Sequence, residues 1–193
     1  MRKLMYSLLA VVFLLASMSP MVSGASLLDQ AQNRSCVVIV GDAAVKTPDF
    51  IKYVDEAFNT VGKNKKVISG TEIQSKYQSY WLDKGFLEEQ KLTKQDLLNF
   101  VKYSGYNKVL FLIVSNPVIE KTNQGYGGWS AWSQTERTRA SITIKSFLVD
   151  ETTVIKAVDV SKEDDSITSE LRAKRGAFQK CITEIKTAIE SSI

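Results

Sequence analysis

The chain has 193 residues, a formal net charge of +4 and no histidine. Histidine is the usual general base at neutral pH, the usual partner of a serine or cysteine nucleophile and the commonest metal ligand. Its absence argues against an enzyme, and we expect neither a cofactor nor a bound metal. A secreted hydrolase that uses carboxylates and a carrier of a small ligand or metal stay open as alternatives.

Residues 1–25 have the anatomy of a secretory signal. Arg2 and Lys3 precede an apolar stretch over residues 4–16, and small residues surround position 24. Cleavage after residue 24 or after residue 25 fits these small residues, and we favour the second. The apolar stretch is shorter than the roughly 20 residues that cross a bilayer core, so the sequence predicts a cleaved signal rather than an anchor. No later stretch is long and apolar enough to span a membrane, and we expect a periplasmic or secreted protein.

Cleavage would remove Arg2 and Lys3 but no acidic residue, which lowers the net charge from +4 to +2. So small an excess predicts no strong attraction to nucleic acid or to anionic lipid. The expected partner is a protein or a component of the cell envelope, and the sequence does not predict the oligomeric state. Residues 26–35 form a polar lead-in, and residues 36–193 are long enough for one well-packed domain.

The first half of this domain alternates strands and helices. Residues 36–40 are a short apolar run rich in β-branched side chains, which predicts a strand buried on both faces. A helix follows from Thr47-Pro48, then a short strand at 66–69 and a helix over 71–84. Thr93 and Asp96 resemble a capping box that opens a third helix. Residues 108–114 form the strongest predicted strand and also suggest a central position.

The second half begins with a polar, glycine-rich insertion over residues 115–136. Residues 140–149 and 153–160 alternate apolar and polar side chains, and a short turn joins them, so we expect an antiparallel hairpin. An acidic loop over 162–166 precedes a long final helix. Its predicted buried stripe comprises Ile167, Leu171, Phe178, Cys181, Ile182, Ile185 and Ile189.

The predicted fold is therefore α/β, a mixed sheet of about five strands with helices packed on it. The element order is β-α-β-α-α-β-β-β-α, with a C-terminal hairpin and a closing helix. Cys36 and Cys181 lie near opposite ends of the exported chain. In an oxidising compartment an even pair suggests one disulfide, and two buried thiols are the alternative because both cysteines have apolar neighbours.

Four segments resemble a family of bacterial envelope proteins. They are the strand at 37–40, residues 67–77 (VISGTEIQSKY), residues 103–114 (YSGYNKVLFLIV) and the paired strands 142–150 and 154–160. The order and patterning resemble the domain shared by the curli-secretion lipoprotein CsgG, the amino-terminal domain of TolB and LpoB, an activator of peptidoglycan synthases.

This chain departs from that family in three respects. The turn that begins at Asp150 is Asp-Glu-Thr-Thr rather than Asp-x-x-Thr-Gly, and both the lipid-anchor cysteine and the pore-forming hairpins are missing. A secretion-channel role is therefore not carried over. The resemblance implies a non-catalytic adaptor fold of the cell envelope.

The most unusual segment is the insertion, which carries Tyr126, Trp129 and Trp132 among polar and glycine residues. Aromatic side chains on a polar loop are typical anchors of binding surfaces, so these three are the candidate partner-binding residues. The alternative is that the tryptophans fold back over a sheet edge.

Acidic residues are the other candidates. Asp42 follows the first strand, where α/β folds often bind ligands, but no glycine-rich phosphate loop follows it and we favour a turn former. Asp159, Glu163, Asp164 and Asp165 lack the spacing of a calcium loop and suggest a solvated acidic loop.

Overall fold

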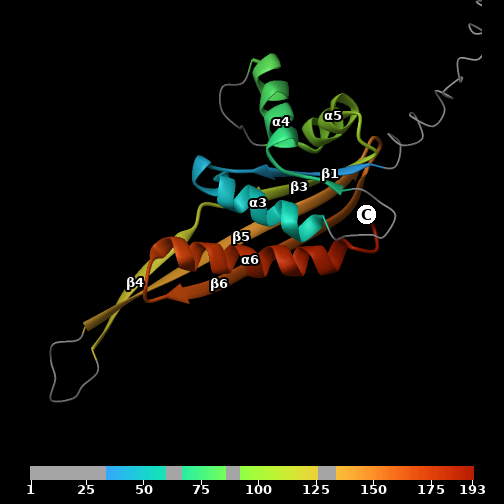
Figure 1. The fold of residues 1–193 in the computed structure, drawn as a ribbon. Coiled ribbons are helices and arrows are strands. Elements are labelled where there is room, and N and C mark those ends of the chain that lie inside the picture. Colours follow the sequence, from blue (N-terminus) through green and yellow to red (C-terminus); the bar gives the residue numbers. More distant parts are fainter. Residues whose placement is uncertain (1–33, 60–66, 86–91, 126–133) are drawn as a thin grey trace, which may run out of the picture. The chain divides into compact units, whose positions relative to one another are not determined.

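The computed structural model describes residues 34–59, 67–85, 92–125 and 134–193. The signal over 1–25 and the lead-in up to residue 33 lie outside the described residues. The described chain builds a six-stranded mixed sheet with helices on both faces (Figure 1), which confirms the predicted fold class. The strands are β1 (Ser35–Val40), β2 (Val67–Ile68), β3 (Lys108–Val114), β4 (Val118–Gly125), β5 (Gln134–Asp150) and β6 (Val154–Ser166).

The two apolar runs that predict central strands do lie in the middle of the sheet. The strand order is β2-β1-β3-β5-β4, and β6 pairs with β5. β1 runs parallel to β2 and β3, whereas β5 is antiparallel to β3, β4 and β6. Every residue of β1 is buried, as expected for a strand with helices on both sides.

Two helices cover each face of the sheet. α3 (Pro48–Phe58) and α6 (Glu170–Ile189) pack on one face, and α4 (Thr71–Asp83) and α5 (Lys94–Ser104) pack on the other. The capping box predicted for α5 is present, because the Thr93 hydroxyl accepts from the Asp96 N–H and the Asp96 carboxylate accepts from the Thr93 N–H. The α3 helix begins at Pro48, whose fixed φ suits the first turn.

The period of two along each strand sorts the apolar side chains into two buried clusters. Val37 and Ile39 of β1 join the cluster under α3 and α6. Cys36 and Val38 join the cluster under α4 and α5. Aromatic rings dominate the second cluster, where Tyr77 packs edge-on against Phe100 at 5.1 Å between ring centroids.

The expected disulfide between Cys36 and Cys181 is not formed, and both cysteines are free and buried. The reason is topological, because Cys36 belongs to the cluster of α4 and α5, while Cys181 on α6 belongs to the other. The sheet lies between the two thiols. Cys181 Sγ instead donates to the backbone oxygen of Ile142 on β5, at 3.4 Å.

The prediction of irregular structure is wrong for residues 118–125 and 134–136 of the insertion and for the acidic loop. Residues 118–125 form β4, and β5 begins at Gln134 rather than near Ala140. The acidic residues at 162–166 belong to β6, which continues to Ser166. Polar strands of this kind carry no apolar alternation, so the pattern that locates buried strands misses them.

The closing helix also begins later than its apolar stripe suggests. The side chains of Ile167 and Leu171 are exposed rather than buried. From Phe178 onward the predicted stripe is correct, and Ile182 and Ile185 are fully buried against the sheet. Among the described residues, no helix combines the length and the apolar character that a membrane span requires.

Candidate functional site

The candidate aromatic residues Tyr126, Trp129 and Trp132 lie outside the described residues, but the strands on both sides of them are described. β4 pairs with residues 134–141 of β5 from Val118 opposite Ser141 to Gly125 opposite Gln134. We call this pair of strands the β4–β5 arm. In Figure 1 the arm extends beyond the N-terminal end of α6. The aromatic segment joins the two paired residues at the far end of the arm.

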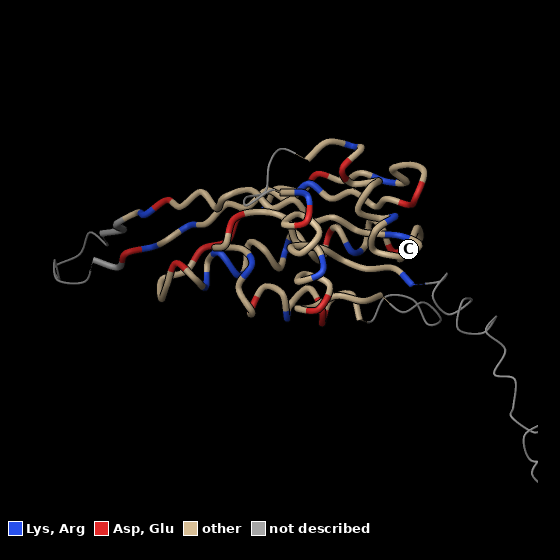
Figure 2. The backbone as a smooth tube through the Cα atoms, turned by 90° about the horizontal axis from the view of Figure 1, so that it is seen from above, with Lys and Arg blue, Asp and Glu red and all other residues tan. Residues whose placement is uncertain are grey.

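Ion pairs between neighbouring strands run along the arm. Lys121 Nζ on β4 lies 3.2 Å from Glu136 Oε1 on β5, and Arg137 Nη2 on β5 lies 2.6 Å from Asp165 Oδ2 on β6. Arg139 Nε donates to Asp165 Oδ1 at 3.1 Å. Figure 2 shows basic and acidic positions interspersed along these strands. Arg139 and Asp165 lie directly opposite each other, and the other two pairs are diagonal neighbours. Opposite charges at such positions stabilise an antiparallel ladder, which helps a polar segment to adopt strand structure.

Asp165 is the acidic centre of this network. The hydrogen bond from Arg139 and the charges of Arg137 and Arg139 lower the pKa of the Asp165 carboxyl. The same contact raises the pKa of the Arg139 guanidinium. Both groups therefore stay charged across the neutral range, and their charge-assisted hydrogen bond links β5 to β6.

Asp42, the candidate of the alternative hydrolase hypothesis, is exposed and precedes a single 3-10 turn over Ala43–Val45. Asp150 acts in a turn, as its sequence suggests. Its carboxylate accepts from the N–H groups of Thr152 and Thr153, each at 2.7 Å. These two bonds, with the hydroxyl of Thr152, lower the pKa of the Asp150 carboxyl.

The structure separates the acidic residues of β6. Cross-strand pairing places Asp159, Glu163 and Asp165 on the sheet face opposite α6, whereas Asp164 lies on the α6 side. There Lys180 Nζ reaches Asp164 Oδ1 at 2.6 Å. No group of three or more His, Cys, Asp or Glu side chains within the described ranges is arranged to hold a metal ion.

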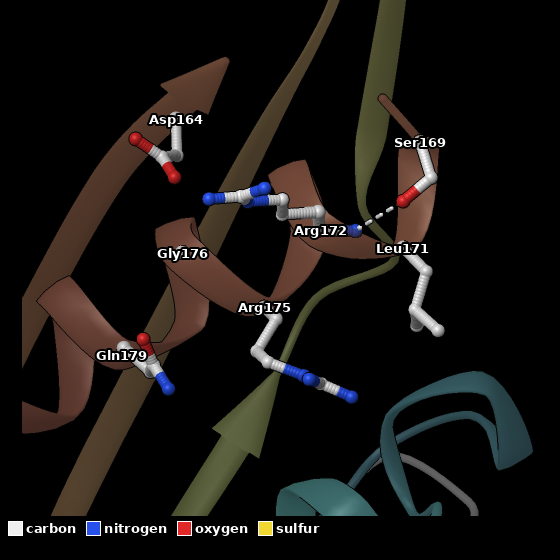
Figure 3. Close-up of a pocket in the computed structure, with 7 residues that line it drawn as sticks. All are labelled: Asp164, Ser169, Leu171, Arg172, Arg175, Gly176 and Gln179. Carbon is white, nitrogen blue, oxygen red and sulfur yellow. Dashed lines mark hydrogen bonds between the residues drawn. The ribbon is translucent and has the colours of Figure 1, made fainter. Parts of the chain in front are cut away.

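The first turns of α6 border a shallow pocket of about 450 Å³ (Figure 3). Arg172 points toward the strand that carries Asp164, and Arg175 points toward the opposite side, where its guanidinium pairs with Asp49 of α3. Ser169 caps the helix by accepting from the Arg172 N–H. The lining is mostly polar, and Leu171 supplies an exposed apolar side chain.

A second pocket of about 490 Å³ lies between α4 and α5. Tyr80 and Tyr103 line it with ring centroids 4.8 Å apart, and the Lys84 ammonium lies 5.8 Å from the centroid of the Tyr80 ring. Sequence patterning does not find this pocket, because its lining residues come from two helices that are separate in the sequence. The exposed ring of Tyr103 is visible only once α4 and α5 are packed together.

These features define the protein as a mixed α/β fold with a projecting β4–β5 arm. No protein-family model and no curated protein matches the chain. Several solved bacterial proteins are similar in fold, among them lipoprotein GNA1162 from Neisseria meningitidis. That protein is 11% identical, with a TM-score of 0.46 over 82% of this chain and 99% of its own.

PelC from Paraburkholderia phytofirmans, solved as a dodecamer, is 9% identical, with a TM-score of 0.42 over 81% of this chain and 88% of its own. Rare lipoprotein B from Shewanella oneidensis is 9% identical, with a TM-score of 0.34 over 83% of this chain and 92% of its own. These scores assign neither ligand nor partner to this chain. The resemblance to CsgG and to the TolB domain stays a prediction.

Proposed function

We propose that this chain is an exported, non-catalytic binding module that recognises a protein or a cell-envelope component. In this proposal Tyr126, Trp129 and Trp132 contact the partner. The observation that supports it is the β4–β5 arm, which pairs as far as Gly125 and Gln134, the two residues that flank the aromatic segment in the sequence. A large aromatic side chain buries much area at a low cost in side-chain entropy.

The polar character of the arm supports the same function. Lys121–Glu136 joins its two strands and Arg137–Asp165 joins β5 to β6, so ion pairs rather than apolar burial support the arm. Such a ladder can hold strands in register away from the helices, where an apolar strand would expose its side chains to water. The arm would thus present the aromatic residues apart from the core, so that contact with a partner need not disturb the fold.

The test is affinity capture from the native host with the wild-type protein and with a Trp129→Ala/Trp132→Ala variant, quantified by mass spectrometry. The variant is expected to retain the wild-type circular dichroism and to lose at least tenfold of the captured partner, as truncation of interface anchors does. A Leu82→Ala/Tyr103→Ala variant is the control. It removes two exposed apolar side chains from α4 and α5 and should capture normally. Equal capture by both variants would contradict the proposal.

A further inference from the structure

Among the described residues, no helix covers most of the face of β5 and β6 that lies opposite α6. α4 and α5 lie on this side of the sheet, but they pack over β1, β3 and the last residues of β5. Beyond them the exposed or half-exposed side chains form what we call the open face. It comprises Arg139, Ser141, Thr143 and Lys145 of β5 and Asp159, Ser161, Glu163 and Asp165 of β6.

Charge on the open face is sorted by strand. The basic residues Arg139 and Lys145 lie on β5, and all the acidic residues lie on β6. The register places Arg139 opposite Asp165 and Lys145 opposite Asp159. Between these two charged pairs, the hydroxyls of Thr143 and Ser161 are 3.0 Å apart. The face thus has a basic row on β5 and an acidic row on β6, and the acidic row includes Glu163 opposite Ser141.

This arrangement is self-complementary. Consider a two-fold axis that runs parallel to the strands, above the open face and midway between β5 and β6. Rotation about this axis places β5 of the second copy over β6 of the first, and each residue keeps its position along the strand direction. Lys145 of one copy would then face Asp159 of the second copy, and Arg139 would face Asp165 of the second copy. Each basic residue meets an acidic one because every charged pair within the sheet becomes a charged pair between the copies. Such isologous contacts are the commonest in homodimers.

The side chains leave room for a close approach. Packed sheets lie about 10 Å apart. Between the two charged pairs the open face carries the short side chains of Ser141, Thr143 and Ser161, and Glu163 is the one longer side chain there. Lys145 and Asp159 are exposed, and neither takes part in an ion pair with any described residue. Both charges are therefore available to a facing molecule, although the register places them side by side.

We propose that the open face is a homodimer interface, in which a second copy of this chain packs on β5 and β6 through reciprocal Lys145–Asp159 and Arg139–Asp165 contacts. Complementary charge mainly supplies specificity and a fast association rate, so the affinity should fall steeply with ionic strength. This proposal does not depend on the aromatic segment. Partner capture and dimer formation can succeed or fail separately.

The test is analytical ultracentrifugation of the protein with single charge reversals at Lys145 and at Asp159, which form no ion pair with any described residue. Wild-type protein is expected to dimerise at low salt and to dissociate at about 1 M salt, where the Debye length is about 3 Å. Lys145→Glu and Asp159→Lys should each weaken dimerisation at least tenfold, because each creates two like-charge contacts per dimer. Lys52→Glu on α3, at the opposite face, is the control for net charge and should dimerise normally.

Mixing the two variants separates an interface from a structural role. Lys145→Glu presents two acidic side chains, Asp159→Lys presents two basic ones, and only the mixed pair is complementary across the axis. An equimolar mixture should restore dimers at the wild-type affinity, detected as heterodimers by native mass spectrometry. A monomeric wild type at low salt, unchanged dimerisation of either variant, or a mixture that stays monomeric would each overturn the proposal.

Discussion

Asp164 on β6 lies directly over Gly176 on α6. A Cβ at position 176 would be 1.6 Å from Asp164 Oδ2 and 2.5 Å from its Cγ. Glycine within a helix normally costs up to about 1 kcal/mol relative to alanine. Here it allows the carboxylate that pairs with Lys180 to lie against the helix backbone.

We therefore expect Gly176→Ala to destabilise the protein by about 0.5–2 kcal/mol, because overpacking costs about 1–3 kcal/mol and outweighs the gain in helix propensity. Urea unfolding followed by circular dichroism would measure the difference. Adding Asp164→Ala removes both of the nearest atoms and should recover part of the loss. If Gly176→Ala alone were more stable than the wild type, the contact would not be a close one in solution.

Burial and apolar periodicity predict the part of the fold that lies around β1 and β3. The continuous apolar runs at 36–40 and 108–114, the Thr93 capping box and the alternation within 140–149 all correspond to observed elements. Each of these signals is local and arises from side chains that meet the core. The same rules fail for β4 and for the end of β6, where ion pairs between strands replace apolar burial.

The same contrast between local signals and contacts between distant residues applies to the candidate sites. In the sequence, Tyr126, Trp129 and Trp132 stand out only because they are aromatic residues in a polar, glycine-rich segment. The structure adds the positions at which the paired strands on either side of this segment end. The open face could not be predicted, because Lys145 and Asp159 become neighbours only through the register of β5 and β6. The disulfide prediction failed for a related reason, because sequence separation does not show which side of a sheet a cysteine faces.

The two thiols provide a second prediction. Burial raises the pKa of both, that of Cys181 to about 11 and that of Cys36 further. Because the thiolate is the reactive form, neither thiol should react with a thiol-specific chromogenic reagent at pH 8 while the protein is folded. Denaturant without a reductant should release two reactive thiols per chain. Finding none after denaturation would show that the cysteines are bridged and would contradict the packing described for them.

Asp150 provides a prediction about acid stability. Its pKa is lowered in the folded state by the N–H groups of Thr152 and Thr153, so its contribution to stability is present above the unfolded pKa of about 3.9 and is lost as the pH falls through the folded value. Asp150→Asn keeps an acceptor oxygen but does not titrate. The wild type should therefore have the higher melting temperature at pH 7, and this advantage should shrink toward pH 2. A difference that stays constant over this range would contradict the expected titration.

Gln74 provides the last prediction, because its side chain completes the edge of β1. β2 pairs with β1 only at Ser35 and Cys36. Further along β1, the side chain of Gln74 on α4 hydrogen-bonds to the backbone of Ile39. It accepts from the Ile39 N–H at 3.1 Å and donates to the Ile39 oxygen at 2.7 Å. The amide thus supplies in one side chain the donor and the acceptor that a neighbouring strand would offer.

Gln74→Leu conserves the approximate volume but leaves both buried backbone groups of Ile39 without this partner. Each unsatisfied group costs about 1–3 kcal/mol, so we expect a loss of at least 2 kcal/mol in the free energy of unfolding, measured by urea titration.

Gln74→Glu should be destabilising near neutral pH, because its carboxylate can accept from the Ile39 N–H but faces the Ile39 oxygen without a proton. Protonation would restore the donor, so the cost of Gln74→Glu relative to the wild type should decrease as the pH is lowered, while that of Gln74→Leu should stay unchanged. Equal pH dependence of the two variants would indicate that packing, rather than the paired hydrogen bonds, accounts for the burial of Gln74.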